Sequence, residues 1–183
     1  MVSSNPDGGS GSASSWFDDN AELIQFVGIA LFIFAVLQLI YFELYLGSPV
    51  FKAYLVLCAK LSAGLLLAVG EEVTRFEQTI TSIHGPAVTV VEGCDALRIF
   101  SVLVAAIAAF NASIRDKVLG ILCGLTFMFV INLFRISALL WFDVHLTEWF
   151  DFMHQTGLPL MLWAIAMLYF FLWGTIALRR QSQ

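Results

Sequence analysis

The sequence predicts an all-α integral membrane protein, and three features of its composition and patterning support this fold class. Hydrophobic residues make up 60% of the 183 residues, only 13% are charged, and the mean hydropathy is +0.86. A soluble domain needs more charge to cover its surface. A helix needs about 20 mostly apolar residues to cross about 30 Å of hydrocarbon. The chain contains five such runs, at residues 21–42, 50–70, 96–113, 118–142 and 157–178.

The rest of the composition indicates the domain organisation and the classes of partner. Residues 1–20 are rich in Gly, Ser, Asn and Asp, which predicts a disordered tail before a single transmembrane domain over residues 21–183. The formal net charge of −5 offers no basic surface, so we expect contact with the lipid bilayer and none with nucleic acid. Cys58, Cys94 and Cys123 form no CxxC pair, so we expect neither a metal centre nor a cofactor.

Lysines and arginines in the short connections predict the orientation of the spans, because positively charged flanks stay in the cytoplasm. The clear clusters are Arg115 with Lys117, between the third and fourth spans, and Arg179-Arg180 after the fifth. Counting back from them places Lys52 in the cytoplasm. It places the amino-terminal tail and the loop of residues 71–92 outside. We therefore expect a multi-pass protein of the cell membrane with an outward amino terminus.

Two segments outside the spans are predicted to have local structure. In the outer loop, β-branched runs at residues 75–83 and 87–91 flank a Gly-Pro turn, which fits either a short hairpin or a plain loop. After the fourth span, apolar residues within 146–153 recur at the spacing of one helical face, which predicts a short helix in the membrane interface. His154 follows, and Asp151 is within reach on a helix to orient its imidazole.

Cys94 lies in a polar block at the start of the third apolar run, with Arg98 four residues later. A thiol reacts as the thiolate, which nearby cations favour and apolar burial disfavours. If the helix begins at residue 95, Arg98 lies one turn beyond Cys94 on about the same face. The block therefore fits an activated nucleophile at the outer membrane surface. A buried, inert cysteine is the alternative.

Arg135 is a charge inside the fourth apolar run, one turn after Asn132. An arginine at mid-membrane costs roughly 2.5 to 3.5 kcal/mol on insertion scales, so a functional role is the default hypothesis. The alternatives are that Arg135 snorkels to the outer surface or pairs with Glu92 or Asp95. Under the predicted topology, it lies in the same half of the membrane as the cysteine and the histidine described above.

Three sequence blocks together resemble the exosortase/archaeosortase family of integral-membrane cysteine enzymes. They are EGCDALR from Glu92 to Arg98, NLFRI from Asn132 to Ile136, and HQTG from His154 to Gly157. The resemblance implies catalytic roles for Cys94, Arg135 and His154, supported by Arg98, Asn132 and Asp151. His145 is a rival for the histidine role, but His154 directly precedes the fifth span and has a glycine three residues on.

The chain departs from the family pattern directly after the cysteine. Family members commonly carry Ser or Thr followed by Gly there, whereas this chain has Asp95-Ala96. A carboxylate beside a thiol disfavours the thiolate unless a cation such as Arg98 or Arg135 neutralises it. The chain is also short beside the longer members, so it resembles a minimal core of the family.

The resemblance implies a cysteine protease or transpeptidase that acts at the outer face of the membrane through a thioacyl intermediate. Its substrates would be exported proteins that end in a short motif, a transmembrane helix and a basic tail. Transfer of the acyl group to water or to an amine stays open. A membrane thiol oxidoreductase would need a partner thiol, for which Cys58 and Cys123 are poorly placed. A non-enzymatic transporter or assembly subunit explains Arg135 but not the Cys94 block.

Overall fold

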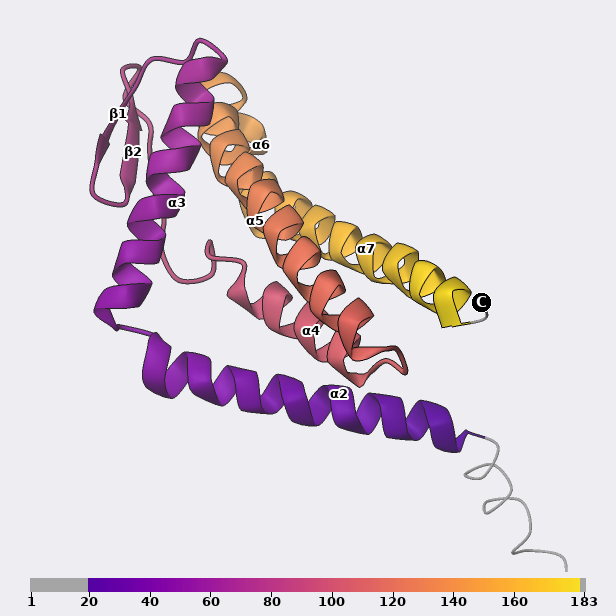
Figure 1. The fold of residues 1–183 in the computed structure, drawn as a ribbon. Helices are drawn as coiled ribbons and strands as arrows, with labels where there is room; N and C mark the ends of the chain where they lie inside the picture. Colours follow the sequence, from indigo (N-terminus) through magenta and orange to yellow (C-terminus); the bar gives the residue numbers. More distant parts are fainter. Residues whose placement is uncertain (1–19, 182–183) are drawn as a thin grey trace, which may run out of the picture.

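The structure, a computed structural model, describes residues 20–181 and is predominantly helical (Figure 1). The predicted disordered tail, residues 1–20, lies outside the described residues except for Asn20. The helices are α2 (Ala21–Ile40), α3 (Pro49–Ala68), α4 (Leu97–Ala109), α5 (Ile114–His145), α6 (Thr147–Phe152) and α7 (Leu158–Gln181), with π-helical segments η1 (Tyr41–Tyr45) and η2 (Met153–Gly157). Three strands, β1 (Val73–Phe76), β2 (Thr79–Ser82) and β3 (Ala87–Thr89), lie between α3 and α4.

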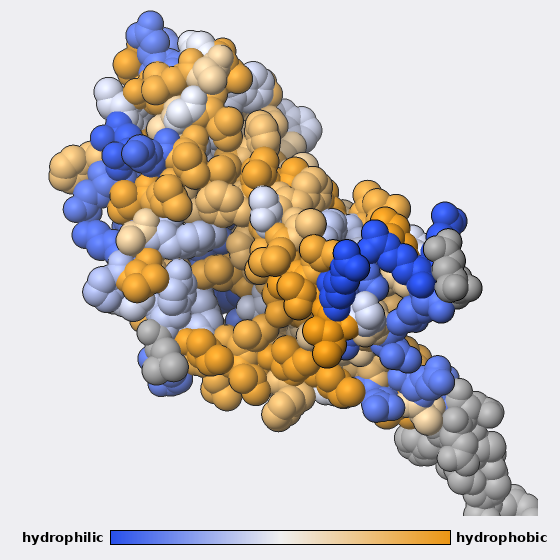
Figure 2. All heavy atoms as spheres, viewed as in Figure 1, coloured by the Kyte–Doolittle hydropathy of each residue, from blue (hydrophilic) through white to orange (hydrophobic). Residues whose placement is uncertain are grey.

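Four helical stretches in the described part of the chain are long and apolar enough to cross a membrane, which confirms the predicted all-α integral membrane class. They are Ala21–Glu43, Pro49–Ala68, Ile114–His145 and Thr147–Gln181. No residue of α2 is buried within the protein. Figure 2 shows apolar side chains over the side where α2 lies, while hydrophilic residues gather around the sheet and around the end of the molecule that holds the start of α5. This surface suits a hydrocarbon environment.

The predicted span over residues 96–113 is shorter than expected. Helix α4 has 13 residues, which at 1.5 Å per residue gives about 20 Å, less than the roughly 30 Å of hydrocarbon. It begins only after Ala96, which has a left-handed backbone, and Phe110 at its end is extended. Ser113 then caps α5 by accepting a hydrogen bond from the N–H of Asp116. One apolar run is thus divided into a short helix, a connection and a helix cap.

The start of α2 lies beside the connection between α4 and α5. Phe26 packs edge-on against Phe110, with ring centroids 6.5 Å apart, and stacks on Phe170 of α7 at 6.4 Å. Glu22 and Lys117 line the same cavity at this end of the molecule. The prediction that the amino terminus lies on the opposite side from Lys117 is therefore wrong for the start of α2.

At the other end of α2 the chain bends sharply into α3 (Figure 1). Gly47 adopts a positive φ of 80°, and Ser48 caps α3 by accepting a hydrogen bond from the N–H of Phe51. Lys52 Nζ lies 3.2 Å from a carboxylate oxygen of Glu77, in the loop that was predicted to lie outside. The prediction that Lys52 and this loop lie on opposite sides of the membrane is therefore wrong at Glu77.

The strands form an antiparallel sheet in the order β1-β2-β3. The predicted hairpin is present between β2 and β3, where Ile80 pairs with Val88 and Gly85 has a φ of 107° in the connection. The run of residues 75–83, however, is divided by a tight turn at Glu77, with a φ of 48°, so that β1 adds a third strand. Ile80 and Val88 are buried in the core formed with α3 and α5.

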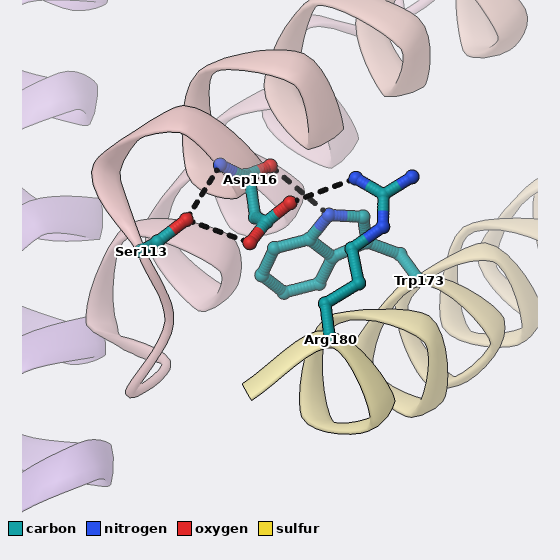
Figure 3. Close-up of polar contacts among 4 residues, drawn as sticks. All are labelled: Ser113, Asp116, Trp173 and Arg180. Atoms are coloured by element: carbon teal, nitrogen blue, oxygen red, sulfur yellow. Dashed lines mark hydrogen bonds and ion pairs between the residues drawn. The ribbon is translucent and has the colours of Figure 1, made fainter. Parts of the chain in front are cut away.

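Helices α5 and α7 pack antiparallel at close range. The hydroxyl of Tyr169 donates to the carbonyl of Gly120 at 2.7 Å. The indole N–H of Trp173 donates to the carbonyl of Asp116 at 3.2 Å, and Arg180 donates to the Asp116 carboxylate (Figure 3). A Cβ atom at Gly120 would clash with the Trp173 ring, so a glycine is required for this approach. These contacts fix the register of the two helices.

Candidate active site

Cys94 lies in the segment that connects the sheet to α4. The N–H of Val90 donates to the Gln78 carbonyl at 2.9 Å and extends the pairing with β2. The N–H of Cys94 then donates to the carbonyl of Val91 at 3.0 Å and closes a turn through Gly93, which has a φ of 90°. The turn directs Cys94 into the core, where it is only 7% exposed. The thiol is therefore buried in this structure, as in the alternative of a buried cysteine.

Ala96 occupies a left-handed conformation, with a φ of 58° and a ψ of 6°, immediately before α4. Glycine adopts this region without steric cost, whereas an L-residue with a Cβ atom pays about 1–2 kcal/mol. Ala96 is also 5% exposed, so a larger side chain has no room. This backbone geometry is the one that a glycine adopts most readily.

We expect Ala96→Val to lower the free energy of unfolding by about 2–4 kcal/mol, because a β-branched side chain is disfavoured at positive φ and overfills a buried site. Ala96→Gly is the matched control. It should stay within about 1 kcal/mol of the parent, because relief of the backbone roughly offsets the lost burial of one methyl group. Denaturant unfolding of the detergent-solubilised protein measures both effects. Equal stability of the valine variant would contradict the left-handed assignment.

Asp95 anchors the cysteine segment to the bend between α2 and α3. Its carboxylate accepts a hydrogen bond from the hydroxyl of Tyr41 at 2.8 Å, and it accepts a longer one, 3.4 Å, from the N–H of Leu97 at the start of α4. The hydroxyl of Tyr54 donates to the Asp95 carbonyl, also at 2.8 Å. Asp95 is 1% exposed. A buried carboxylate needs such donors, and a helix start favours negative charge.

The arginines expected to neutralise Asp95 are bound elsewhere. Arg98 lies 3.7 Å from the carboxylate of Glu92 and 5.7 Å from the ring centroid of Phe42. Because α4 begins at Leu97, Cys94 and Arg98 do not share a helical face as predicted. Tyr41 and Tyr54 instead supply the partners of Asp95. Neither tyrosine has a local sequence signal for this role, because the contact joins residues more than 40 positions apart.

Asn132 connects the cysteine segment to Arg135. Its side-chain amide donates to the carbonyl of Cys94 at 2.9 Å, and its carbonyl oxygen accepts from Nη1 of Arg135 at 3.5 Å. Asn132 is fully buried. Residues three apart share one face of a helix, so α5 directs both side chains to the same place. Asn132 is 18 residues after the start of α5, which places this cluster about 27 Å along the helix.

Arg135 is 8% exposed and makes no ion pair within residues 20–181. The alternatives of pairing with Glu92 or Asp95 are excluded for this state, because those carboxylates bind Arg98 and Tyr41. A guanidinium group carries five N–H donors, and one long hydrogen bond to Asn132 uses only one of them. The remaining donors are therefore available to an oxygen-rich ligand.

The two histidines of this region have different environments. His145 lies 2.7 Å from the carboxylate of Glu71 and packs against Trp141. His154 is exposed in η2, with its ring centroid 5.6 Å from that of Phe150. The hydrogen bond from the imidazole N–H of His154 to the Asp151 carboxylate, which the sequence suggested, is not formed in the described structure. The side chain of His154 likewise makes no hydrogen bond to Cys94 or Arg135 there.

The antiparallel register of α5 and α7 can be extended toward His154. Trp173 is level with Asp116, and Tyr169 is level with Gly120. Extending this antiparallel register brings His154 about level with Arg135. Met153 and Leu158, on either side of His154, pack in the same apolar core as Cys94. The structure thus links Cys94, Asn132 and Arg135 by hydrogen bonds, whereas within the described residues His154 makes no hydrogen bond to any of them.

The fold and the site together define a class of protein. It is a helical membrane protein in which α5 links the Cys94 turn to Arg135, an arginine without an ion pair in the described residues. Comparison with protein families identifies the group within this class. The model of the transmembrane exosortase family matches residues 21–172, and the chain belongs to that family. Comparisons with curated proteins and with solved structures find no significant match.

Proposed function

We propose that this exosortase is a cysteine protease or transpeptidase that cleaves C-terminal sorting signals of exported proteins at the outer face of the cell membrane. The observation that carries the proposal is the link from the Cys94 segment through Asn132 to the unpaired Arg135. Family membership supports the class of reaction. The substrates would carry a short motif, a transmembrane helix and a basic tail.

The positive charges support the proposed orientation of the site. Arg115, Lys117 and Arg180 gather where α5 begins and α7 ends (Figure 3 shows part of this end). Positive flanks remain in the cytoplasm. The Cys94 and Asn132 cluster lies about 27 Å farther along α5, close to the opposite limit of a hydrocarbon layer of about 30 Å. This depth favours a site that opens toward the outer face.

In the proposed reaction, the Cys94 thiolate attacks the carbonyl carbon of the scissile peptide bond. The C–N bond then breaks, the amine leaves with a proton, and the acyl group stays on Cys94 as a thioester. Water or an amine attacks the thioester and regenerates the thiol. Arg135 stabilises the oxyanion of each tetrahedral intermediate through its free N–H groups. His154 transfers the protons, a role that imidazole side chains commonly take in acyl transfer.

The test is a search for the thioester. The chain is co-expressed with a tagged protein that ends in a short motif, one apolar span and several arginines. We expect a covalent adduct between the chain and the tagged fragment that neutral hydroxylamine releases. Mass spectrometry then locates the acyl group on Cys94. Substrate that stays intact, or cleavage without any dependence on Cys94, would contradict the proposal.

One observation favours a second candidate, a membrane thiol oxidoreductase. Cys58 is fully buried in the same apolar core as Cys94. Its place inside the second predicted span had suggested a larger separation from Cys94. All three cysteines are free in this structure. The same experiment separates the two functions, because a disulfide adduct of Cys94 is released by a reductant and resists hydroxylamine.

A further inference from the structure

Strand β3 is an edge of the sheet, and it leads directly to the cysteine. It pairs with β2 on one side only. The hydrogen bonds from Ser82 to Pro86 and from Val90 to Gln78 show which residues of β3 face β2. Because backbone groups alternate along an antiparallel pair, Pro86, Val88 and Val90 face β2. The N–H and C=O groups of Ala87 and Thr89 therefore point away from the sheet.

These outward groups are accessible and have no partner within residues 20–181. Ala87 and Thr89 are exposed, while Val88 between them is buried. The hydroxyl of Thr89 pairs with that of Thr79 on the exposed face and leaves the Thr89 backbone free. The exposed surface continues through residues 91–93 to Cys94. A row of unpaired N–H and C=O groups is the binding surface for another extended chain.

We infer that the free edge of β3 binds the substrate as an added β-strand and thereby guides the scissile peptide toward Cys94. The inference rests on the proposed function, because it assigns this edge to the polypeptide that Cys94 cleaves. Thr89 precedes Cys94 by five residues. An extended peptide advances about 3.3 Å per residue, so a substrate strand paired with Thr89 reaches the cysteine segment within a few residues.

The pairing accounts for recognition that does not depend on side chains. Ala87 and Thr89 together offer two N–H donors and two carbonyl acceptors, enough for four main-chain hydrogen bonds. Such bonds hold an extended backbone of any sequence, and pockets for side chains supply the specificity. Only an extended polypeptide presents donors and acceptors at this spacing. A lipid or a folded helix does not complement the edge.

Ala87→Pro tests the edge directly. Proline removes the Ala87 N–H and obstructs the edge, but it breaks no hydrogen bond between β2 and β3. We expect a rise in KM for the tagged substrate of about 3- to 10-fold, corresponding to the loss of one or two hydrogen bonds. Arg75→Pro is the matched control, because the N–H of Arg75 faces the opposite edge of the sheet by the same alternation. It should leave KM within about twofold of the parent.

Two further measurements keep the result interpretable. The rate of Cys94 alkylation by iodoacetamide should be the same in both proline variants and the parent, which shows that the cysteine segment is intact. An unchanged KM for Ala87→Pro, with processing still abolished by Cys94→Ala, would overturn the edge proposal alone. Processing that persists in Cys94→Ala would overturn the proposed function instead.

Disulfide trapping tests the same edge without relying on proline. Ala87→Cys or Thr89→Cys is introduced into a chain that also carries Cys94→Ser and Cys123→Ser, so that bound substrate is not cleaved. Single cysteines are then scanned along the tagged substrate around its cleavage motif. Because side chains on one face of a strand recur every second residue, crosslinks should form at alternate positions. The favoured positions should shift by two between the variants. Crosslinks without this period, or none at all, would overturn the proposal.

Discussion

Cys94→Ala and Cys94→Ser are both expected to abolish processing of a tagged substrate, with a loss of three orders of magnitude or more. Alanine removes the only atom that can form the thioester. Serine keeps the shape, but its hydroxyl is a far weaker nucleophile than a thiolate near neutral pH. Immunoblotting of the co-expressed substrate measures the effect, and the amount of each variant in the membrane fraction shows whether it is inserted.

Cys123→Ala provides the matched control. Cys123 is a free, exposed cysteine on α5, about two and a half turns before Asn132. Its loss should leave processing unchanged. Processing by Cys94→Ala at the rate of the parent would remove the nucleophile from the mechanism. Loss of processing in both cysteine variants would indicate a general defect in folding and would withdraw support from a specific role for Cys94.

The sequence was sufficient to find the helices and the residues of the cluster. Four of the five predicted apolar runs form helices that are long and apolar enough to cross a membrane, because the thickness of the hydrocarbon dictates the length of a spanning helix. The blocks around Cys94 and Arg135 lie far apart in the chain. Their order and spacing nevertheless resemble those of the exosortase family, to which the chain belongs. The i to i+3 spacing of Asn132 and Arg135 also placed them on one helical face.

The orientation of the first two spans could not be predicted in the same way. Counting lysines and arginines assumes that every apolar run crosses the membrane once and that consecutive runs alternate. The chain instead bends at Gly47 so that α3 leads away from α2, and α4 is too short to span (Figure 1). The ion pair between Lys52 and Glu77 depends on this tertiary arrangement. No local pattern in the sequence records it.

Asp95 shows a second limit of sequence reasoning. Beside a cysteine it suggested a charge conflict that an arginine should resolve. In the structure its carboxylate is turned to Tyr41 and to the start of α4, so its partners are neutral donors. The same residue therefore fixes the cysteine segment against the α2–α3 bend. Such a contact joins residues 54 positions apart, and only the folded chain reveals it.

Arg135→Lys is expected to lower kcat/KM by about 10²- to 10³-fold, the usual loss when one oxyanion donor is removed. Lysine preserves the charge but replaces the planar fork of donors by a point charge on a flexible stem. It also loses the geometry that joins Arg135 to Asn132. Steady-state kinetics with a purified substrate measures the effect. If Arg135 acts only in the transition state, kcat should fall while KM changes little.

Arg115→Lys is the matched control, because Arg115 is an exposed arginine at the opposite end of the same helix. It should retain the kinetics of the parent. Near-normal kcat in Arg135→Lys, with activity lost in Arg135→Ala, would show that charge alone suffices and would exclude bidentate contact. Near-normal kcat in both variants would remove Arg135 from the reaction, and its burial beside Asn132 would then be structural. A buried guanidinium without an ionic partner in the described residues is costly to keep. We therefore expect the large fall in kcat/KM given above for Arg135→Lys.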